Sequence, residues 1–219
     1  LLASKPSKVF LRNEILNPQS MSGEYSKFFS LAKKLNKPVI LVTGGNQGSH
    51  IINQTIFELL PRLLERMHVI HQTGNAVTIN DFAEGQKLAR AVEGGYAGSY
   101  FVFDYVGPDM IGDVFNYSDV VVSRAGVNIL CDLFALGKKA IIIPIPKTSN
   151  NEQGNNADFF ARTGLGTSLS QSELSADRLF QEIIALQARS LSIETIQHVR
   201  SLIHLDAGDR LADVVLAEV

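Results

Sequence analysis

The chain has 219 residues, 45% of them hydrophobic, a size that allows one sizeable core but not two full-sized domains. Acidic and basic side chains nearly balance at a formal net charge of −2, so no broad field predicts nucleic acid or an anionic membrane as the main partner. The single cysteine, Cys131, excludes an internal disulfide bond and a thiolate metal cluster, which favours a reducing, cytosolic compartment.

Short apolar runs alternate with helical stretches along the chain. The runs predicted to be strands are Val39–Thr43, Met67–Gln72, Tyr100–Tyr105, Asp119–Ser123, Ala140–Pro144 and Gly166–Leu169. Most of them are continuous and β-branched, as in parallel strands that are buried on both faces. The predicted crossover helices are His50–Arg66, Thr78–Val92, Met110–Tyr117, Val127–Leu136, Glu152–Arg162 and Leu174–Gln187. This alternation predicts an α/β fold with a Rossmann-like, doubly wound parallel sheet.

Two features qualify this pattern. Pro61 falls inside the first predicted helix, which we expect to be interrupted there because proline removes a helical hydrogen bond. After Gln187 the pattern is helical only, with predicted helices at Ile193–Leu205 and Ala207–Val219. No stretch is long and apolar enough to predict a membrane-spanning helix. The chain also starts without an initiator methionine or a signal peptide, so we expect it to be part of a longer protein.

Most of the predicted strands end in a small, polar or glycine-containing cluster. The clusters are Thr43–Ser49, Gln72–Gly74, Tyr105–Gly107, Ser123–Gly126 and Pro144–Gln153. In an open doubly wound sheet, the carboxyl ends of the strands form the ligand crevice, and helix N-termini point N–H groups and partial positive charge into it. An anionic, phosphorylated ligand is therefore the expected occupant.

The first cluster places Gly44-Gly45-x-x-Gly48-Ser49 between a strand and a helix. Glycine has no Cβ, so this loop allows the backbone to approach a diphosphate closely. A tight turn without a ligand is the alternative. No Lys-Ser or Lys-Thr follows Gly48, which excludes a nucleoside-triphosphate P-loop, and the end of the second strand lacks the acid of a dinucleotide site.

Other polar residues leave more than one interpretation open. Asp132, in an otherwise apolar predicted helix, could accept hydrogen bonds from a ribose diol or be a solvated acid near a helix N-terminus. Arg124 could contact a phosphate or form a structural ion pair. His68 and His71 are three residues apart on a strand and face opposite sides, which argues against a shared metal site.

Taken in order, the motifs are similar to those of the MurG family of glycosyltransferases. Val39–Gln54 resembles the family's GGSxGA glycine loop, Asp119–Leu133 its SRAG segment, and Pro144–Ala157 its proline strand end followed by HQ-x-x-NA. The resemblance spans Lys8 to Ala185. It implies the nucleotide-sugar-binding half of an inverting GT-B enzyme that transfers N-acetylglucosamine from its UDP-sugar to a lipid-linked peptidoglycan precursor.

The resemblance also implies which residues contact each part of the donor. For the diphosphate they are Gly44, Gly45, Asn46, Gln47 and Gly48, with the main chain of Gly126, Val127, Asn128 and Ile129. For the uracil they are Tyr105 and Val106, for the ribose Asp132, and for the transferred sugar Glu152 and Gln153. Asn46, Asp132 and Glu152 replace the family's Ser, Glu and His. The family's phosphate-binding arginine is absent at its matching position, with Arg12 nearby.

By the same resemblance, residues 1–22 are the first segment from a missing N-terminal domain. Residues 23–190 form the donor-binding domain and 191–219 a C-terminal helical extension. The catalytic base, the lipid-linked acceptor site and any peripheral contact with the cytoplasmic face of the inner membrane are expected in the full-length protein only. No metal, cofactor or nucleic acid is expected, and the chain alone should bind a UDP-sugar without transferring it. A glycolipid (diacylglycerol) glycosyltransferase and a noncatalytic nucleotide-sugar-binding subunit stay open as alternatives.

Overall fold

The structure is a computed structural model that describes residues 37–76, 79–96, 99–204 and 206–217. Within them, one parallel sheet has the strand order β3-β2-β1-β4-β5-β6. The strands are β1 Val39–Thr43, β2 His68–Gln72, β3 Tyr100–Phe103, β4 Val120–Ser123, β5 Ala140–Ile142 and β6 Gly166–Ser168. The helices are α2 His50–Leu64, α3 Asp81–Val92, α4 Pro108–Tyr117, α5 Val127–Leu136, α6 Glu152–Arg162, α7 Ala176–Ala188, α8 Ile193–Ser201 and α9 Ala207–Ala217, with a 3₁₀ turn, η2, at Ser149–Asn151.

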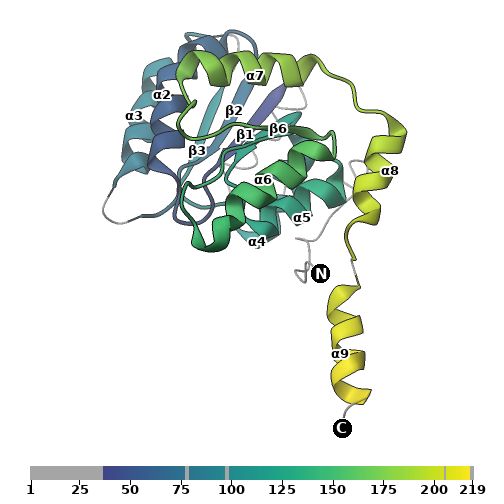
Figure 1. The fold of residues 1–219 in the computed structure, drawn as a ribbon. Coiled ribbons are helices and arrows are strands. Elements are labelled where there is room, and N and C mark those ends of the chain that lie inside the picture. Colours follow the sequence, from purple (N-terminus) through teal and green to yellow (C-terminus); the bar gives the residue numbers. More distant parts are fainter. Residues whose placement is uncertain (1–36, 77–78, 97–98, 205, 218–219) are drawn as a thin grey trace.

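The sheet is the middle layer of the fold. Helices α2, α3 and α7 cover one face, and α4, α5 and α6 cover the other (Figure 1). Because successive side chains of a strand point to opposite faces, β1 contributes to two separate cores. Val39 and Leu41 belong to the core under α4, α5 and α6, whereas Ile40 and Val42 belong to the core under α2 and α7. The expected doubly wound α/β sheet is confirmed.

The strand order reverses between β1 and β4. The chain first adds β2 and β3 on one side of β1, then returns to place β4, β5 and β6 on the other. At such a switch point the loops that follow the two central strands diverge to opposite faces, which leaves a crevice at their carboxyl ends. The switch point thus lies between β1 and β4, at the edge where the sequence predicted the ligand crevice.

The observed elements agree closely with the predicted ones, with one exception. The interruption expected at Pro61 is wrong, because α2 runs continuously from His50 to Leu64. Pro61 lies in the last turn and is exposed, while Leu59, Leu60, Leu63 and Leu64 around it are fully buried. A proline inside a helix costs about 3 kcal/mol, and the burial of those leucines offsets this cost.

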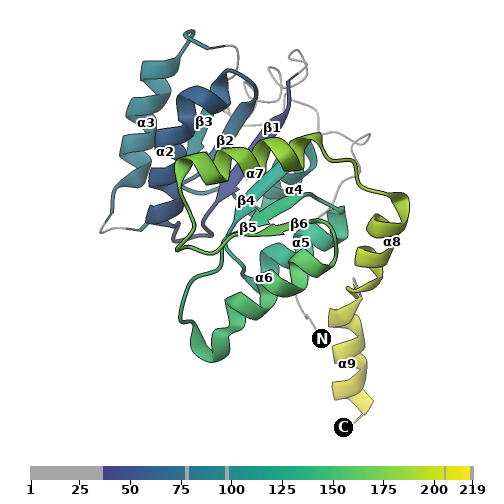
Figure 2. The ribbon, with the colours of Figure 1, turned by 45° about the horizontal axis from the view of Figure 1, so that its top comes forward.

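The C-terminal helices differ in how they meet the sheet domain. Helix α8 packs on α5: Val199 is fully buried, and Arg200 Nε donates a hydrogen bond to the Ala135 carbonyl at 3.1 Å. Helix α9 extends away from the domain (Figure 2), and its Val214, Val215 and Leu216 are exposed. No helix in the described ranges has the length and apolar character needed to span a membrane. Residues 1–22, the predicted linker, lie outside the described residues.

The pair Phe159 and Phe160 tests the core beneath α6. The Phe160 ring is fully buried and stacks on Phe134 with a centroid separation of 5.7 Å, whereas Phe159 is 39% exposed. We expect Phe160→Ala to lower the free energy of unfolding by about 3–5 kcal/mol because it leaves a cavity. Phe159→Ala should cost less than about 1.5 kcal/mol, since it loses mainly an edge contact with Phe134. Chemical denaturation measures both; equal losses would contradict the assigned packing.

Candidate functional site

The glycine loop after β1 is held in a defined shape by its own backbone. Gly45 N–H donates to Thr43 Oγ1 at 3.1 Å, and Gly48 N–H donates to the Gly45 carbonyl at 3.0 Å. Gly45 and Gly48 have φ angles of 84° and 80°, a left-handed region that side chains other than glycine rarely adopt. Gly45, Asn46 and Gln47 are exposed, so this part of the loop faces solvent.

The loop after β2 packs directly on the glycine loop. A Cβ on Gly48 would overlap the Thr73 carbonyl, and one on Gly74 would overlap the backbone of Gly48. Asn75 N–H also donates to the Asn46 carbonyl at 3.1 Å. By contrast, a Cβ on Gly45 would meet nothing within 4 Å. Gly48 and Gly74 are thus required by contact between the two loops, while Gly45 faces open space where a ligand can approach.

A third loop joins this assembly through Gln72, the last residue of β2. Its Nε2 donates to the Gly45 carbonyl at 3.1 Å, and its Oε1 accepts a hydrogen bond from Val106 N–H at 3.2 Å. Val106 is buried and Tyr105 is exposed. From the sequence, Gln72 was predicted to lie in a strand-end cluster but not to contact the donor. The signal that could have identified it is a polar residue that ends a strand between two such loops.

Buried polar side chains brace these loops from behind. Asn53 Nδ2 donates to the Thr73 carbonyl at 2.9 Å and to Asp81 Oδ2 at 2.7 Å. The Asn53 amide oxygen must then accept from His71 Nε2 at 3.0 Å, which leaves His71 Nδ1 to accept from the Tyr100 hydroxyl at 3.0 Å. This network is the second feature that sequence reasoning missed, because its members come from four separate elements.

The electrostatics of this network follow from its burial. Desolvation lowers the pKa of His71 to about 3, although the nearby Asp81 charge acts in the opposite direction. Burial also raises the pKa of Tyr100. His71 is therefore neutral at physiological pH, as the hydrogen bonds require. Asp81 also meets the exposed His50, whose Nδ1 lies 2.9 Å from Asp81 Oδ1.

Three helices that start at this edge of the sheet have uncapped N-termini. No side chain caps α2, α4 or α5, whose N-cap residues are Ser49, Gly107 and Gly126, whereas Thr148 Oγ1 accepts from Gln153 N–H in the first turn of α6 at 3.2 Å. The side chains of Asn80, Ser175 and Ser192 do cap α3, α7 and α8. Helix α5 also has no acidic residue in its first turn. Its free N–H groups and partial positive charge are available to an anion.

Helix α5 places three of the predicted site residues on one face. Asn128 is exposed, and Asp132, half-buried, lies four residues further along the helix and three after Ile129. Residues at these spacings share a face, so Asp132 lies one turn below the helix N-terminus. Val127, the first residue of α5, follows Gly126, where a Cβ would meet nothing within 4 Å.

The segment between β5 and α6 positions the last two predicted residues. Lys147, Asn150 and Asn151 adopt positive φ angles of 58°, 52° and 53°, which is unfavourable for residues other than glycine. Gln153 Oε1 stabilises the segment by accepting a hydrogen bond from Ile145 N–H at 3.0 Å. Glu152 is exposed at the start of α6.

Arg124 pairs with no acid among the described residues, so the structural ion pair considered from the sequence is wrong. Its Nη1 donates to the carbonyls of Ile143 and Pro144 at 3.2 Å each, and its Nη2 donates to Gln171 Oε1 at 2.8 Å. Burial lowers the pKa of its guanidinium. The side chain connects the ends of β4 and β5, and a contact with a phosphate stays a prediction.

The histidines on β2 have separate partners. His68 Nδ1 accepts a hydrogen bond from Ser99 N–H at 2.9 Å, while His71 belongs to the buried network. In the part of the chain that the structure describes, no cluster of three or more His, Cys, Asp or Glu side chains could hold a metal ion.

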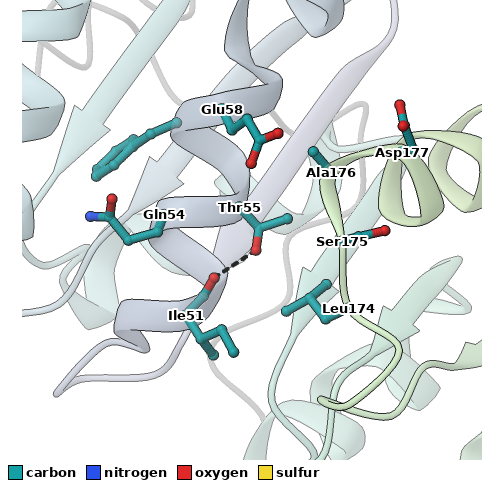
Figure 3. Close-up of a pocket in the computed structure, with 9 residues that line it drawn as sticks. Ile51, Gln54, Thr55, Glu58, Leu174, Ser175, Ala176 and Asp177 are labelled. Carbon is teal, nitrogen blue, oxygen red and sulfur yellow. Dashed lines mark hydrogen bonds between the residues drawn. The ribbon is translucent and has the colours of Figure 1, made fainter.

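A hollow of about 580 Å³ lies between α2 and the start of α7 (Figure 3). It contains none of the predicted site residues. Its lining residues are Ile51, Gln54, Thr55, Phe57, Glu58, Leu174, Ser175, Ala176 and Asp177. Ser175 caps α7, and Asp177 pairs with Arg62 at 2.6 Å. With two carboxylates and a capped helix, this hollow is unsuited to an anion.

Comparisons with known proteins agree on one family. Residues 39–205 match the model of the glycosyltransferase family 28 C-terminal domain. A Geobacter sulfurreducens protein named UDP-N-acetylglucosamine-N-acetylmuramyl-(pentapeptide) pyrophosphoryl-undecaprenol N-acetylglucosamine transferase is 32% identical over 183 residues, which cover 81% of this chain and 47% of that protein. A Clostridium botulinum (strain Kyoto / Type A2) protein of the same name is 32% identical over 174 residues, which cover 79% and 44%. The chain thus spans about half the length of these relatives.

Solved structures share the fold at lower sequence identity. Acinetobacter baumannii MurG superposes with a TM-score of 0.70 and 20% identity, covering 95% of this chain and 59% of that chain. CalG4, the calicheamicin glycosyltransferase, gives a TM-score of 0.60 with 21% identity over 83% of this chain and 42% of its own.

Gly45 and Gly48 have different surroundings, so alanine at each position should have a different effect on stability. Gly48→Ala places a Cβ against the Thr73 carbonyl at a positive φ, so we expect a loss of more than about 2 kcal/mol in the free energy of unfolding. Gly45→Ala meets no neighbour and should cost only the backbone strain, about 1–2 kcal/mol. Denaturant titration compares the variants. A Gly45 variant less stable than the Gly48 variant would refute the loop contact.

The buried His71 predicts a pH dependence of stability. Its folded pKa of about 3 lies below the ordinary value of 6.5, so the unfolded chain binds more protons between these values. The free energy of unfolding should therefore fall as the pH is lowered from about 6.5 toward 3, by up to about 1.4 kcal/mol per pH unit for one proton. His71→Gln should make this slope shallower in denaturation curves recorded across the range. Identical slopes would show that His71 does not contribute.

Proposed function

The chain belongs to glycosyltransferase family 28 through its C-terminal domain, and on this premise we propose that it is the donor-binding part of an N-acetylglucosaminyltransferase. The proposed reaction transfers N-acetylglucosamine from UDP-N-acetylglucosamine to a lipid-linked peptidoglycan precursor, as the names of the relatives indicate for those proteins. The observation that carries the proposal is the meeting of an exposed glycine loop with uncapped helix N-termini at one edge of the sheet.

We propose that main-chain N–H groups hold the donor diphosphate. Gly44, Gly45, Asn46, Gln47 and Gly48 line one side of the crevice, and the N-terminus of α5 at Gly126–Ile129 lies at the neighbouring strand end. These dipoles are already oriented before the reaction, so they stabilise the negative charge that develops on the departing UDP. In this proposal no resident metal ion is needed to neutralise it.

The remaining donor groups are assigned by position. The Tyr105–Val106 backbone is proposed to read the uracil, and the Asp132 carboxylate to accept hydrogen bonds from the ribose hydroxyls, one turn below the phosphate-binding end of α5. The Gln153 oxygen is engaged by Ile145 N–H, which directs its NH₂ group as a donor for a sugar hydroxyl. Glu152 lies beside it.

The chemical step needs a second part of the protein. An acceptor hydroxyl attacks the anomeric carbon as the bond from that carbon to the UDP oxygen breaks, with inversion, and a base removes the hydroxyl proton. We propose that the acceptor site, this base and a peripheral contact with the cytoplasmic face of the inner membrane belong to the half of the relatives that the chain does not span. Holding the two reactants together is worth about 7–11 kcal/mol of the barrier, which these residues alone would not supply.

Binding of UDP to the chain tests this proposal. We expect UDP and UDP-N-acetylglucosamine to bind, GDP to bind more weakly, and a chelator to leave the affinity unchanged. Asp132→Asn should weaken UDP binding by about 1.5–3 kcal/mol because the ribose loses a charged acceptor. Asp158→Asn, an exposed acid on α6, is the matched control.

Isothermal titration calorimetry, with thermal stability measured in parallel, separates the outcomes. An unchanged dissociation constant for Asp132→Asn at equal stability would remove Asp132 from the site. If the chain of the natural sequence binds neither UDP nor UDP-N-acetylglucosamine, the proposed donor site is wrong.

A further inference from the structure

Gln72 joins the two loops that are proposed to hold opposite ends of the nucleotide. It ends β2, which lies between β1 and β3 in the sheet, and only 4% of it is exposed. Its amide donates to the Gly45 carbonyl and accepts from Val106 N–H, at 3.1 and 3.2 Å. One side chain therefore uses both halves of its amide on two different backbone segments.

Each of these hydrogen bonds fixes the orientation of a whole peptide group. In a trans peptide the C=O and N–H bonds point in opposite directions. The Gly45 carbonyl points at the buried Gln72 and also accepts from Gly48 N–H at 3.0 Å, so the Asn46 N–H of the same peptide points away, toward the exposed side of the loop. None of the described residues accepts a hydrogen bond from this N–H.

The second peptide is turned the other way. Val106 N–H points at Gln72, so the Tyr105 carbonyl of the same peptide points away from it. Tyr105 is 41% exposed, whereas Val106 is 3% exposed. The result is a pair of oriented main-chain groups, an N–H donor on the glycine loop and a carbonyl acceptor on the loop after β3.

We infer that Gln72 is a positioning residue that sets both of these groups for the nucleotide, the Asn46 N–H for a phosphate oxygen and the Tyr105 carbonyl for the base. This inference rests on the proposed function. A carbonyl acceptor pairs with a base whose ring carries an N–H at position 3, as uracil does, and meets the lone pair of N3 in cytosine. Gln72 therefore controls which pyrimidine binds by orienting the Tyr105 carbonyl, without contacting the base itself.

A purely structural Gln72 would have a different signature. Its loss would leave Val106 N–H without a partner and the Gly45 carbonyl with Gly48 N–H alone. Stability would fall, but the binding of all nucleotides would weaken equally. A positioning role also changes the ratio of affinities for two bases, because the Tyr105 peptide becomes free to turn. The ratio of the UDP and CDP dissociation constants is thus the decisive readout.

The test compares Gln72→Leu with the natural sequence in calorimetric titrations with UDP and CDP. We expect the natural chain to prefer UDP by about 10-fold or more, a difference typical of one or two hydrogen bonds. In Gln72→Leu the preference should fall to within about 3-fold, and UDP affinity should fall about 10-fold as well. Gln171→Leu, which removes the glutamine that binds Arg124 at the same edge, should keep the preference.

The outcomes separate this inference from the proposed function. If the natural chain prefers UDP and Gln72→Leu keeps that preference, Gln72 is only structural and the donor site stands. If the natural chain binds UDP and CDP equally, the Tyr105 carbonyl does not read the base. If it binds neither, the proposed function and the inference both fail.

A measurement on the natural chain decides the case if Gln72→Leu does not fold. In amide NMR spectra, pyrophosphate should shift the Asn46 resonance, and uridine should leave Val106 N–H protected from exchange because Gln72 still binds it. Loss of that protection on adding uridine would show that the base takes the Val106 N–H from Gln72, which would overturn the inference.

Discussion

The backbone contact between the loops after β1 and β2 is the constraint on which the rest of the site depends. Gly48 and Gly74 approach so closely that neither could hold a Cβ. This contact brings Asn75 to the Asn46 carbonyl and Gln72 to the Gly45 carbonyl, so the glycine loop is held from one side and exposed on the other. A loop held in this way presents its N–H groups without the conformational entropy cost of ordering them when a ligand binds.

Burial of polar groups maintains that constraint. Asn53 connects α2 to the loop after β2 and to α3 through two hydrogen bonds, and a third, with His71, extends the connection to Tyr100 across the sheet. A buried network of this kind is stable only when every member has a partner, because an unpaired buried group costs about 1–3 kcal/mol. The network therefore specifies one arrangement of the loops, which burial of apolar side chains alone would leave less defined.

The partial positive charge at this edge of the sheet comes from helix N-termini that lack side-chain caps. The side chains of Asn80, Ser175 and Ser192 cap α3, α7 and α8, whereas α2, α4 and α5 begin after Ser49, Gly107 and Gly126 without a side-chain cap. The missing caps leave donors that only solvent or a ligand can satisfy. At the same edge, Arg124 donates to the carbonyls of Ile143 and Pro144, which follow the neighbouring strand β5.

The sequence by itself determined the strands, the helices and the edge of the sheet at which the donor site is proposed, because continuous β-branched runs and strand-end glycines are local patterns with a direct physical cause. It also predicted that the glycine loop and the start of α5 bind the diphosphate, because the residues of each segment are contiguous in the chain. Only the tertiary structure decided the roles of Gln72, Asn53 and Arg124, since their partners lie on separate elements and a polar residue does not indicate its partner in advance. The continuity of α2 through Pro61 was likewise decided by packing, because buried leucines outweigh a local preference.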